Sequence, residues 1–203
     1  MTSIDTGIGP IPTQTEGQGP ILKHRPVVGL DLSLTATGVC IIDGGVPDTF
    51  TVHSSVDPER TVLSLIGRCN SIVDGIASQI VAVADDALFV VEGLSMHSKS
   101  SSLDRIFASW YLILGELHHR YGQEAAVVAP TQRAKYASGK GNASKDTVLL
   151  AVAARYPSVG VTDNNQADAL VLAAMGARHL GHPVEDSLPV VNLTAMDAVR
   201  WLA

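Results

Sequence analysis

The sequence predicts an α/β fold, in which a mixed sheet of five strands carries helices on both of its faces. Three observations predict it. Three short strand-like segments open the domain, a long helical stripe of apolar residues follows, and apolar runs then alternate with further helical segments. With 203 residues, 46% of them hydrophobic, the chain is long and apolar enough for one domain with a substantial core.

The first three strands are expected over residues 27–34, 39–43 and 49–55. Gly, Pro and Asp punctuate the connection between the second and third strands, which is typical of a tight turn. These segments therefore predict an antiparallel meander. The first strand lies in the stretch VVGLDLSLTATGVCIID and carries an aspartate, Asp31, at its expected centre.

A helix is expected to begin at Asp57 and Pro58, because an N-cap side chain followed by proline favours helix initiation. Its apolar residues recur every three or four positions from Val62 to Val83, as on the buried face of an amphipathic helix. The next strand is expected over residues 86–94. Its run ALFVV is continuously apolar, which predicts a central strand buried on both faces.

Three helices and one strand complete the predicted domain. The helices are expected over residues 102–121, 144–157 and 165–179, with Ser144 as the N-cap of the second, and the strand over residues 125–130. This order of elements is the order of the ribonuclease H-like fold.

The chain is expected to divide into three parts. Residues 1–25 are rich in Gly, Pro, Thr and Gln and show no periodicity, so we expect a flexible leader. Residues 26–181 form the folded domain. Residues 182–203 form a tail, whose segment TAMDAVRWLA is expected to dock as a short helix.

The net charge of −6 argues weakly against a nucleic-acid partner, because phosphate contacts need Lys and Arg. Residues 131–145 are an exception, since they contain no acid and four bases: Arg133, Lys135, Lys140 and Lys145. On charge alone, a solvated loop is the favoured interpretation of this segment. A local basic patch can also steer a polyanion toward an acidic protein.

Cysteine usage and hydropathy indicate a compartment. Cys40 and Cys69 lack metal-ligand spacing and are expected to pack in the core as reduced thiols. No apolar run has the length of a membrane span, and the N-terminus lacks the basic start and apolar core of a secretion signal. We therefore expect a cytoplasmic protein with no membrane partner.

Three acidic residues stand beside apolar runs. Asp31 interrupts the first strand, Glu92 ends the run LFVVE, and Asp168 lies in the helical segment NNQADALVLAA. A buried carboxylate is costly unless it is paired or binds a metal, and no basic residue lies close in sequence to any of them. The first and fourth strands of such a sheet can lie side by side, so we expect Asp31 and Glu92 to meet at one sheet end, with Asp168 brought there by its helix.

Converging carboxylates repel one another, and divalent cations relieve this repulsion. Mg²⁺ and Mn²⁺ prefer oxygen ligands, and two such ions would bridge a phosphodiester, activate water and stabilise the leaving oxygen. Each acid also has an ordinary interpretation. Asp31 would cap a turn, Glu92 would be exposed at a strand end, and Asp168 would lie on the wet face of its helix.

Four motifs resemble those of the RuvC Holliday junction resolvases, over roughly residues 26–180 and in the family's order. VVGLDLSLTATG is similar to the first-strand motif, VVEGL to the motif whose glutamate ends the fourth strand, GKGNASKDTVLL to the basic segment before a helix, and NNQADALVLAA to the C-terminal helix. The resemblance implies a RuvC-like nuclease domain over residues 26–181. Its activity would be cleavage of four-way junctions or other branched DNA, with two Mg²⁺ or Mn²⁺ ions per site, by a homodimer. The diverged sequence and added tails suit a phage-like member.

The resemblance also implies roles for individual residues. Asp31, Glu92 and Asp168 would be the catalytic, metal-binding acids. Lys145 matches a lysine that meets the DNA backbone, and Lys135 matches a second one with a shift of one residue.

Further roles follow from the same resemblance. Arg133 and Lys140 would extend the DNA-binding segment. The helix over residues 102–121 would form the dimer face, because its IFASWYLILGEL stretch combines an apolar stripe with small residues.

Two departures from the family's pattern affect the site. The last helix of the family carries two metal-site residues three apart, and the first of these is Asn165 here. Its amide oxygen can coordinate a hard cation but supplies no charge. We favour Asp163 as the fourth, catalytic carboxylate, with Asn164 as a further candidate because it lies four residues before Asp168. The family's aromatic wedge after the glutamate is absent, and Met96 is the apolar residue expected to insert between DNA bases.

Two alternative functions stay open. The uncharged Asn165 favours a module that binds branched DNA without cutting it. The stretch GLDLSLTATG is also similar to the first phosphate loop of actin-like and sugar-kinase ATPases, although those proteins need two such domains and a longer chain.

Overall fold

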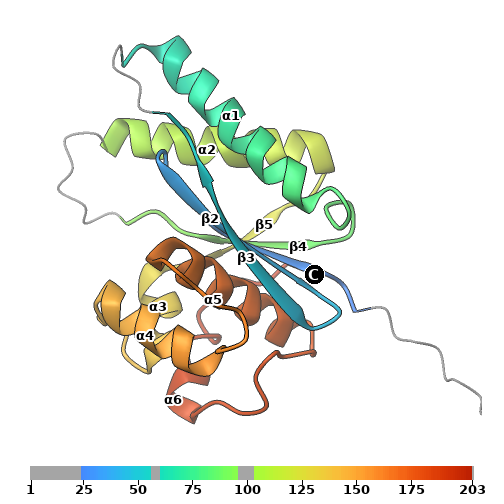
Figure 1. Ribbon diagram of the computed structural model, residues 1–203, viewed down its shortest axis with the longest axis vertical. Coiled ribbons are helices and arrows are strands. Elements are labelled where there is room, and N and C mark those ends of the chain that lie inside the picture. The colour runs from blue at the N-terminus through green and yellow to red at the C-terminus, as the bar shows by residue number, and fades with distance from the viewer. Residues whose placement is uncertain (1–23, 56–59, 96–102, 203) are drawn as a thin grey trace, which may run out of the picture.

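The computed structural model describes residues 24–55, 60–95 and 103–202 and shows one sheet between two layers of helices (Figure 1). The sheet has the strand order β3-β2-β1-β4-β5. Strands β1 to β3 form an antiparallel meander, and β4 lies parallel to both β1 and β5. The sheet is therefore mixed, as predicted. The strands are β1 (Val27–Asp31), β2 (Ala36–Asp43), β3 (Val46–His53), β4 (Leu88–Glu92) and β5 (Ala125–Val128).

Two helices cover one face of the sheet and four lie on the other (Figure 1). Helices α1 and α2 make the first layer, and α3 to α6 make the second. No helix in the described ranges is both long and apolar enough to cross a membrane. The helices are α1 (Val62–Ile80), α2 (Leu103–Tyr121), α3 (Pro130–Ser138), α4 (Lys145–Arg155), α5 (Asn164–His179) and α6 (Val190–Leu193).

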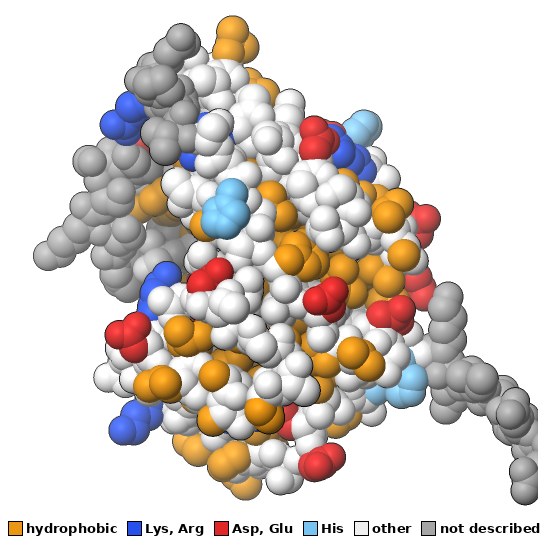
Figure 2. Space-filling view, in the orientation of Figure 1, with side chains coloured by type: hydrophobic (Ala, Val, Ile, Leu, Met, Phe, Trp, Pro, Cys, Tyr) orange, Lys and Arg blue, Asp and Glu red, His pale blue; other side chains and the backbone are white. Residues whose placement is uncertain are grey.

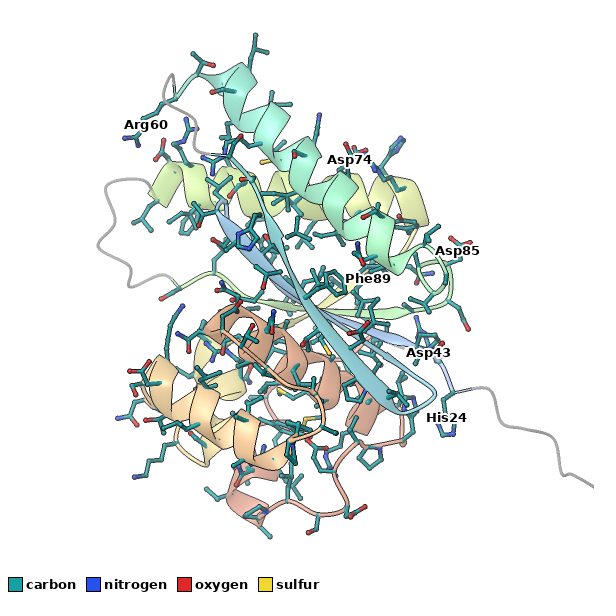
Figure 3. All side chains as sticks on the ribbon, viewed as in Figure 1. His24, Asp43, Arg60, Asp74, Asp85 and Phe89 are labelled. Carbon is teal, nitrogen blue, oxygen red and sulfur yellow. The ribbon has the colours of Figure 1, made fainter. Side chains whose placement is uncertain are left out.

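The central strands send alternate side chains into two separate cores, because the side-chain period of a strand is two. Val28 of β1 and Phe89 of β4 belong to the core beneath α1 and α2, and Figure 3 labels Phe89 in that position. Val27 and Val90 belong to the core beneath α5. Strands β1 and β4 are thus buried on both faces, as the continuous apolar run of β4 predicts.

Helix α5 lies in direct contact with the sheet, because glycines on the strands leave room for its backbone. A Cβ atom on Gly29 would lie 2.2 Å from the backbone oxygen of Ala169, and one on Gly38 would lie 2.0 Å from that of Asn165. No side chain tolerates such distances. Glycine at these two positions therefore brings the first turns of α5 against β1 and β2.

Most predicted boundaries shift by two or three residues, and three differences from the structure matter for the site or the helices. Strand β1 ends at Asp31, so this residue is the last of its strand and not its centre. The predicted N-cap Asp57 lies outside the described residues, and α1 instead begins after Thr61, whose side chain accepts a hydrogen bond from the Ser64 backbone. Residues 131–138, interpreted as part of a solvated loop, belong to helix α3, which begins at Pro130.

The prediction that the segment TAMDAVRWLA forms a short docking helix is wrong, although the tail does pack against the domain. The helical turn α6 precedes the TAMDAVRWLA segment, and Ala195 and Val199 of that segment pack into the core beneath α5 without forming a helix. Cys40 and Cys69 are free and buried, as predicted.

Candidate active site

Asp31 and Glu92 end two neighbouring parallel strands on the same side of the sheet. The register of β1 and β4 pairs Leu30 with Val91, and the next pair in this register is Asp31 with Glu92. The residues two before them, Gly29 and Val90, face α5. Because strand side chains alternate, both carboxylates also face the α5 layer.

Asp168 is carried to this point by α5, and Arg133 by α3. Asp168 lies in the first half of α5 and is 2% exposed. Helix α3 begins almost directly after β5, whose Val128 carbonyl accepts a hydrogen bond from Gly93, the residue after Glu92. Arg133 therefore enters the site within the first turns of α3.

The Arg133 guanidinium joins two of the three carboxylates. Its Nε donates to Oε1 of Glu92 at 2.7 Å, and its Nη1 donates to Oδ1 of Asp168 at 2.5 Å. The Arg133 side chain is 7% exposed, so both ion pairs lie away from solvent. A buried pair of this kind is strongly coupled, because desolvation makes either charge costly alone.

Burial and mutual repulsion raise the pKa values of the site aspartates. Burial, followed by the charges of Glu92 and Asp168, raises the pKa of Asp31 to about 8. Burial also raises the pKa of Asp168 to about 6, and the Arg133 charge opposes this rise. The charge of Lys145 lowers both pKa values, so this lysine acts electrostatically on the site. The site therefore holds protons that a divalent cation would displace.

The oxygens left over in the site fit a hard divalent cation. Oδ2 of Asp168 and Oδ1 of Asn164 are buried and have no hydrogen-bond partner. The two residues are four apart on α5 and so share a face. Asp31, whose charge interacts with that of Asp168, adds a third oxygen ligand of the type that Mg²⁺ and Mn²⁺ prefer.

The carboxylates alone do not form a complete metal site, however. Among the described residues, no three Asp, Glu, His or Cys side chains lie in an arrangement that could hold a metal ion. The Arg133 side chain bonds to Glu92 and Asp168 in this arrangement.

The two residues proposed for the fourth ligand have other surroundings. Asp163 is the N-cap of α5, where its Oδ1 accepts from the Gln166 backbone at 2.9 Å and its Oδ2 from Thr51 at 3.0 Å. The backbone of Asn165 packs against Gly38. Asn164, the further candidate, is the residue whose side-chain oxygen is buried without a partner.

The predicted DNA-binding residues fall into different environments. Lys145 and Lys140 are exposed, Lys145 at the first position of α4 and Lys140 between α3 and α4, while Lys135 is half-buried on α3. Arg133 is buried between carboxylates and not presented at the surface. Met96 lies outside the described residues.

Trp110 is a site residue that the sequence did not single out. Its indole Nε1 donates to the backbone oxygen of Glu92 at 2.9 Å, which fixes the end of β4 from the α2 side. The sequence shows Trp110 only as an aromatic residue of the predicted dimer helix, and no sequence pattern connects it with Glu92.

Among the comparisons with known proteins, the one with solved structures identifies the fold. No protein-family model and no curated protein matches the chain. Thermus thermophilus RuvC in complex with Holliday junction substrate is 18% identical with a TM-score of 0.55, covering 87% of this chain and 99% of that chain. A second structure of Thermus thermophilus RuvC is 19% identical with a TM-score of 0.56, covering 77% of this chain and 97% of that one. The chain therefore has the fold of RuvC, the ribonuclease H-like α/β architecture that its motifs predict.

Proposed function

We propose that this protein is a metal-dependent endodeoxyribonuclease that cleaves four-way junctions or other branched DNA. One observation carries the proposal: Asp31, Glu92 and Asp168 gather at one end of a RuvC-like sheet, beside buried oxygens that lack partners. The fold alone leaves many functions open, since one fold hosts several chemistries. The RuvC structure in complex with a Holliday junction supports branched DNA as the substrate.

The chain's own residues have distinct tasks in this proposal. Asp31, Asp168 and Asn164 would hold the cation, with Glu92 on the Arg133 side of the site. A bound divalent ion would supply an activated water and stabilise charge on the leaving oxygen. Burial favours the protonated form of Asp31 near pH 7, since its pKa is raised to about 8, and a bound cation would favour the ionised form instead. The prediction of two ions per site remains a prediction.

Basic residues beside the carboxylates would hold the DNA backbone. The charge of Lys145 lowers the pKa values of Asp31 and Asp168, so a phosphate bound at these carboxylates would also interact with Lys145. Lys140 and Lys135 extend the positive charge along α3 and the loop after it. Figure 2 shows most Lys and Arg side chains of this view on its left side, the side at which β4 ends in Figure 1.

Helix α2 is proposed as the contact with a second copy of the chain. Tyr111 and Leu112 are 66% and 42% exposed on this helix. Trp110, Tyr111 and Leu114 line a cavity of about 540 Å³ between α2 and β5, the edge strand of the sheet. A dimer of this kind would present two sites to two strands of one junction. Sedimentation of the protein and of Tyr111→Glu tests it, since the variant should be monomeric.

The decisive experiment is cleavage of a labelled four-way junction in Mg²⁺ and in Mn²⁺. Asp31→Asn should bind the junction and leave it uncut. Asp43→Asn is the matched control, because Asp43 is exposed at the opposite end of the sheet, where β2 ends. Unimpaired cleavage by Asp31→Asn would refute the proposal.

The same assay separates the non-cleaving alternative. A junction-binding module would shift the junction on a native gel in Mg²⁺ and give no product on a denaturing gel with the wild-type protein. The uncharged Asn165, at the position where a charged metal-site residue is expected, is the feature that favours this alternative.

A further inference from the structure

Arg133 is a buried cation placed where a nuclease of this type would be expected to hold metal. Its planar fork bonds one oxygen of Glu92 from β4 and one oxygen of Asp168 from α5. A residue serving only as a phosphate contact would present its guanidinium at the surface, whereas this side chain is 7% exposed. The contacts therefore indicate a role toward the carboxylates.

The charges of the site limit how many cations it accepts. When ionised, Asp31, Glu92 and Asp168 together with Arg133 carry a net charge of −2, which one divalent ion neutralises. A second divalent ion beside a retained guanidinium would leave the buried site strongly positive. Unpaired charge of this kind is costly in a low-dielectric interior.

The oxygens divide in the same way as the charges. Arg133 uses Oε1 of Glu92 and Oδ1 of Asp168, while Oδ2 of Asp168 stays buried without a partner, as does Oδ1 of Asn164. Asp168 thus turns one oxygen to the guanidinium and keeps the other for a ligand. The Arg133 side of the site is already compensated in charge, and the other side presents two buried oxygens of the kind that a hard cation prefers.

We propose that Arg133 takes the place of one of the two expected metal ions, so that the DNA-free protein binds a single divalent cation tightly. The inference rests on the proposed function, because it concerns the cation of that same site. Arg133 is a positioning residue: it fixes Glu92 against Asp168 and supplies the charge that a second ion would otherwise provide.

Mn²⁺ titration of the full-length, DNA-free protein tests this inference, with free Mn²⁺ followed by electron paramagnetic resonance. The wild type should bind one ion, with any second ion at least about tenfold weaker, because the retained guanidinium repels it. Arg133→Met removes the charge at similar length and should bind two ions with coupled spectra. Arg133→Lys keeps the charge and should bind one.

The outcomes separate the inference from the proposed function. Two equally tight ions in the wild type, or one ion in both the wild type and Arg133→Met, would overturn the role of Arg133 while leaving a metal nuclease in place. No Mn²⁺ binding by the wild type would overturn both. Circular dichroism checks that each variant is folded, and Arg133→Gln, which keeps a hydrogen-bonding group, replaces Arg133→Met if that variant unfolds.

Discussion

Two buried arginine–carboxylate clusters lie on the same side of the sheet, and they differ in how completely their oxygens are used. In the first, Glu185 of the C-terminal tail accepts hydrogen bonds from the hydroxyls of Tyr136 and Tyr156 and from Arg178 at 3.0 Å. Each Glu185 oxygen has a partner. This tail cluster therefore has the properties of a structural cluster, which stabilises the packing of the tail.

The second cluster, at the sheet end, is left incomplete. Arg133 bonds Glu92 and Asp168, but Oδ2 of Asp168 and Oδ1 of Asn164 remain buried without partners. Unsatisfied buried oxygens cost stability, so a fold that keeps them offers them to a ligand. Both clusters draw on α3, through Arg133 in one and Tyr136 in the other. The comparison teaches that satisfied oxygens indicate structure and unsatisfied ones indicate a site.

The largest expected difference between the clusters is in catalysis. Asp168→Asn keeps the shape of the side chain but removes a metal-binding charge, so junction cleavage should fall by on the order of 10³-fold. Glu185→Gln is the matched change in the tail cluster and should cleave close to the wild-type rate. Single-turnover cleavage with excess protein measures both. Equal losses of cleavage rate in the two variants would contradict the division into a catalytic cluster and a structural one.

The second difference is in stability, where the tail cluster should have the larger effect. Glu185→Ala removes the carboxylate that accepts from two tyrosine hydroxyls and pairs with Arg178, which keeps its hydrogen bonds to the Tyr136 hydroxyl and the residue 185 backbone oxygen. The free energy of unfolding should fall by about 3 kcal/mol, the lower end for a broken buried pair because Arg178 is 20% exposed. Urea denaturation measures the loss, and Glu185→Gln should lose less. A loss of unfolding free energy below about 1 kcal/mol for Glu185→Ala would show that the tail cluster contributes little to stability.

Much of the site could be predicted because its acids lie at the ends of regular elements. The apolar runs before Asp31 and Glu92 identify two strands, and the fold makes these strands neighbours. Arg133 was expected to bind DNA, and its place between the carboxylates could not be predicted, because it lies 41 residues from Glu92 and 35 from Asp168 in a segment expected to be a loop. Only tertiary structure brings such partners together.

Helix α3 was missed because its sequence, PTQRAKYAS, lacks a clear apolar period. Its signals are local: Pro130 at the first turn, Gln132 accepting a hydrogen bond from the Ala129 backbone, and Gly139 in the left-handed conformation after the last turn. Tyr136 and Ala134 bury the helix beneath the tail. A segment read by charge alone therefore appears as a loop.

The two clusters should also differ in their response to pH. The pKa of Asp31 is raised to about 8 and that of Asp168 to about 6, from 3.8 in both cases, chiefly by burial. The metal-free folded state therefore binds more protons than the unfolded state between about pH 4 and pH 8. Its free energy of unfolding should fall as pH rises through this window, by on the order of 1 kcal/mol per pH unit for each group still titrating.

Urea unfolding at several pH values in EDTA measures this slope. Asp31→Asn should flatten the slope between pH 6 and pH 8, where Asp31 alone of the two aspartates titrates. Saturating Mg²⁺ should also remove it, because the cation replaces the proton. An Asp31→Asn variant with the wild-type slope would show that Asp31 is not held neutral by the fold.

The smallest expected effect distinguishes neighbouring residues at the start of α5. Helical spacing placed Asn164 on the face of Asp168, but the choice among residues 163–165 depended on where the helix begins. The structure begins it after Asp163, whose carboxylate caps the helix and bonds Thr51. Asn164 supplies the buried, unpartnered oxygen, and Asn165 lies against Gly38. The fourth ligand should therefore be an amide that contributes no charge.

Asn164→Ala should weaken Mn²⁺ binding by about tenfold, as the loss of one neutral ligand contact of about 1.4 kcal/mol would. Asn165→Ala is the matched control, one residue along the same helix, and should leave the affinity unchanged. Asp163→Ala should instead lower the free energy of unfolding by about 1 kcal/mol through the lost N-cap, with little change in Mn²⁺ affinity. Weaker Mn²⁺ binding in Asp163→Ala than in Asn164→Ala would restore Asp163 as the fourth ligand, and would mean that the cap opens when the cation binds.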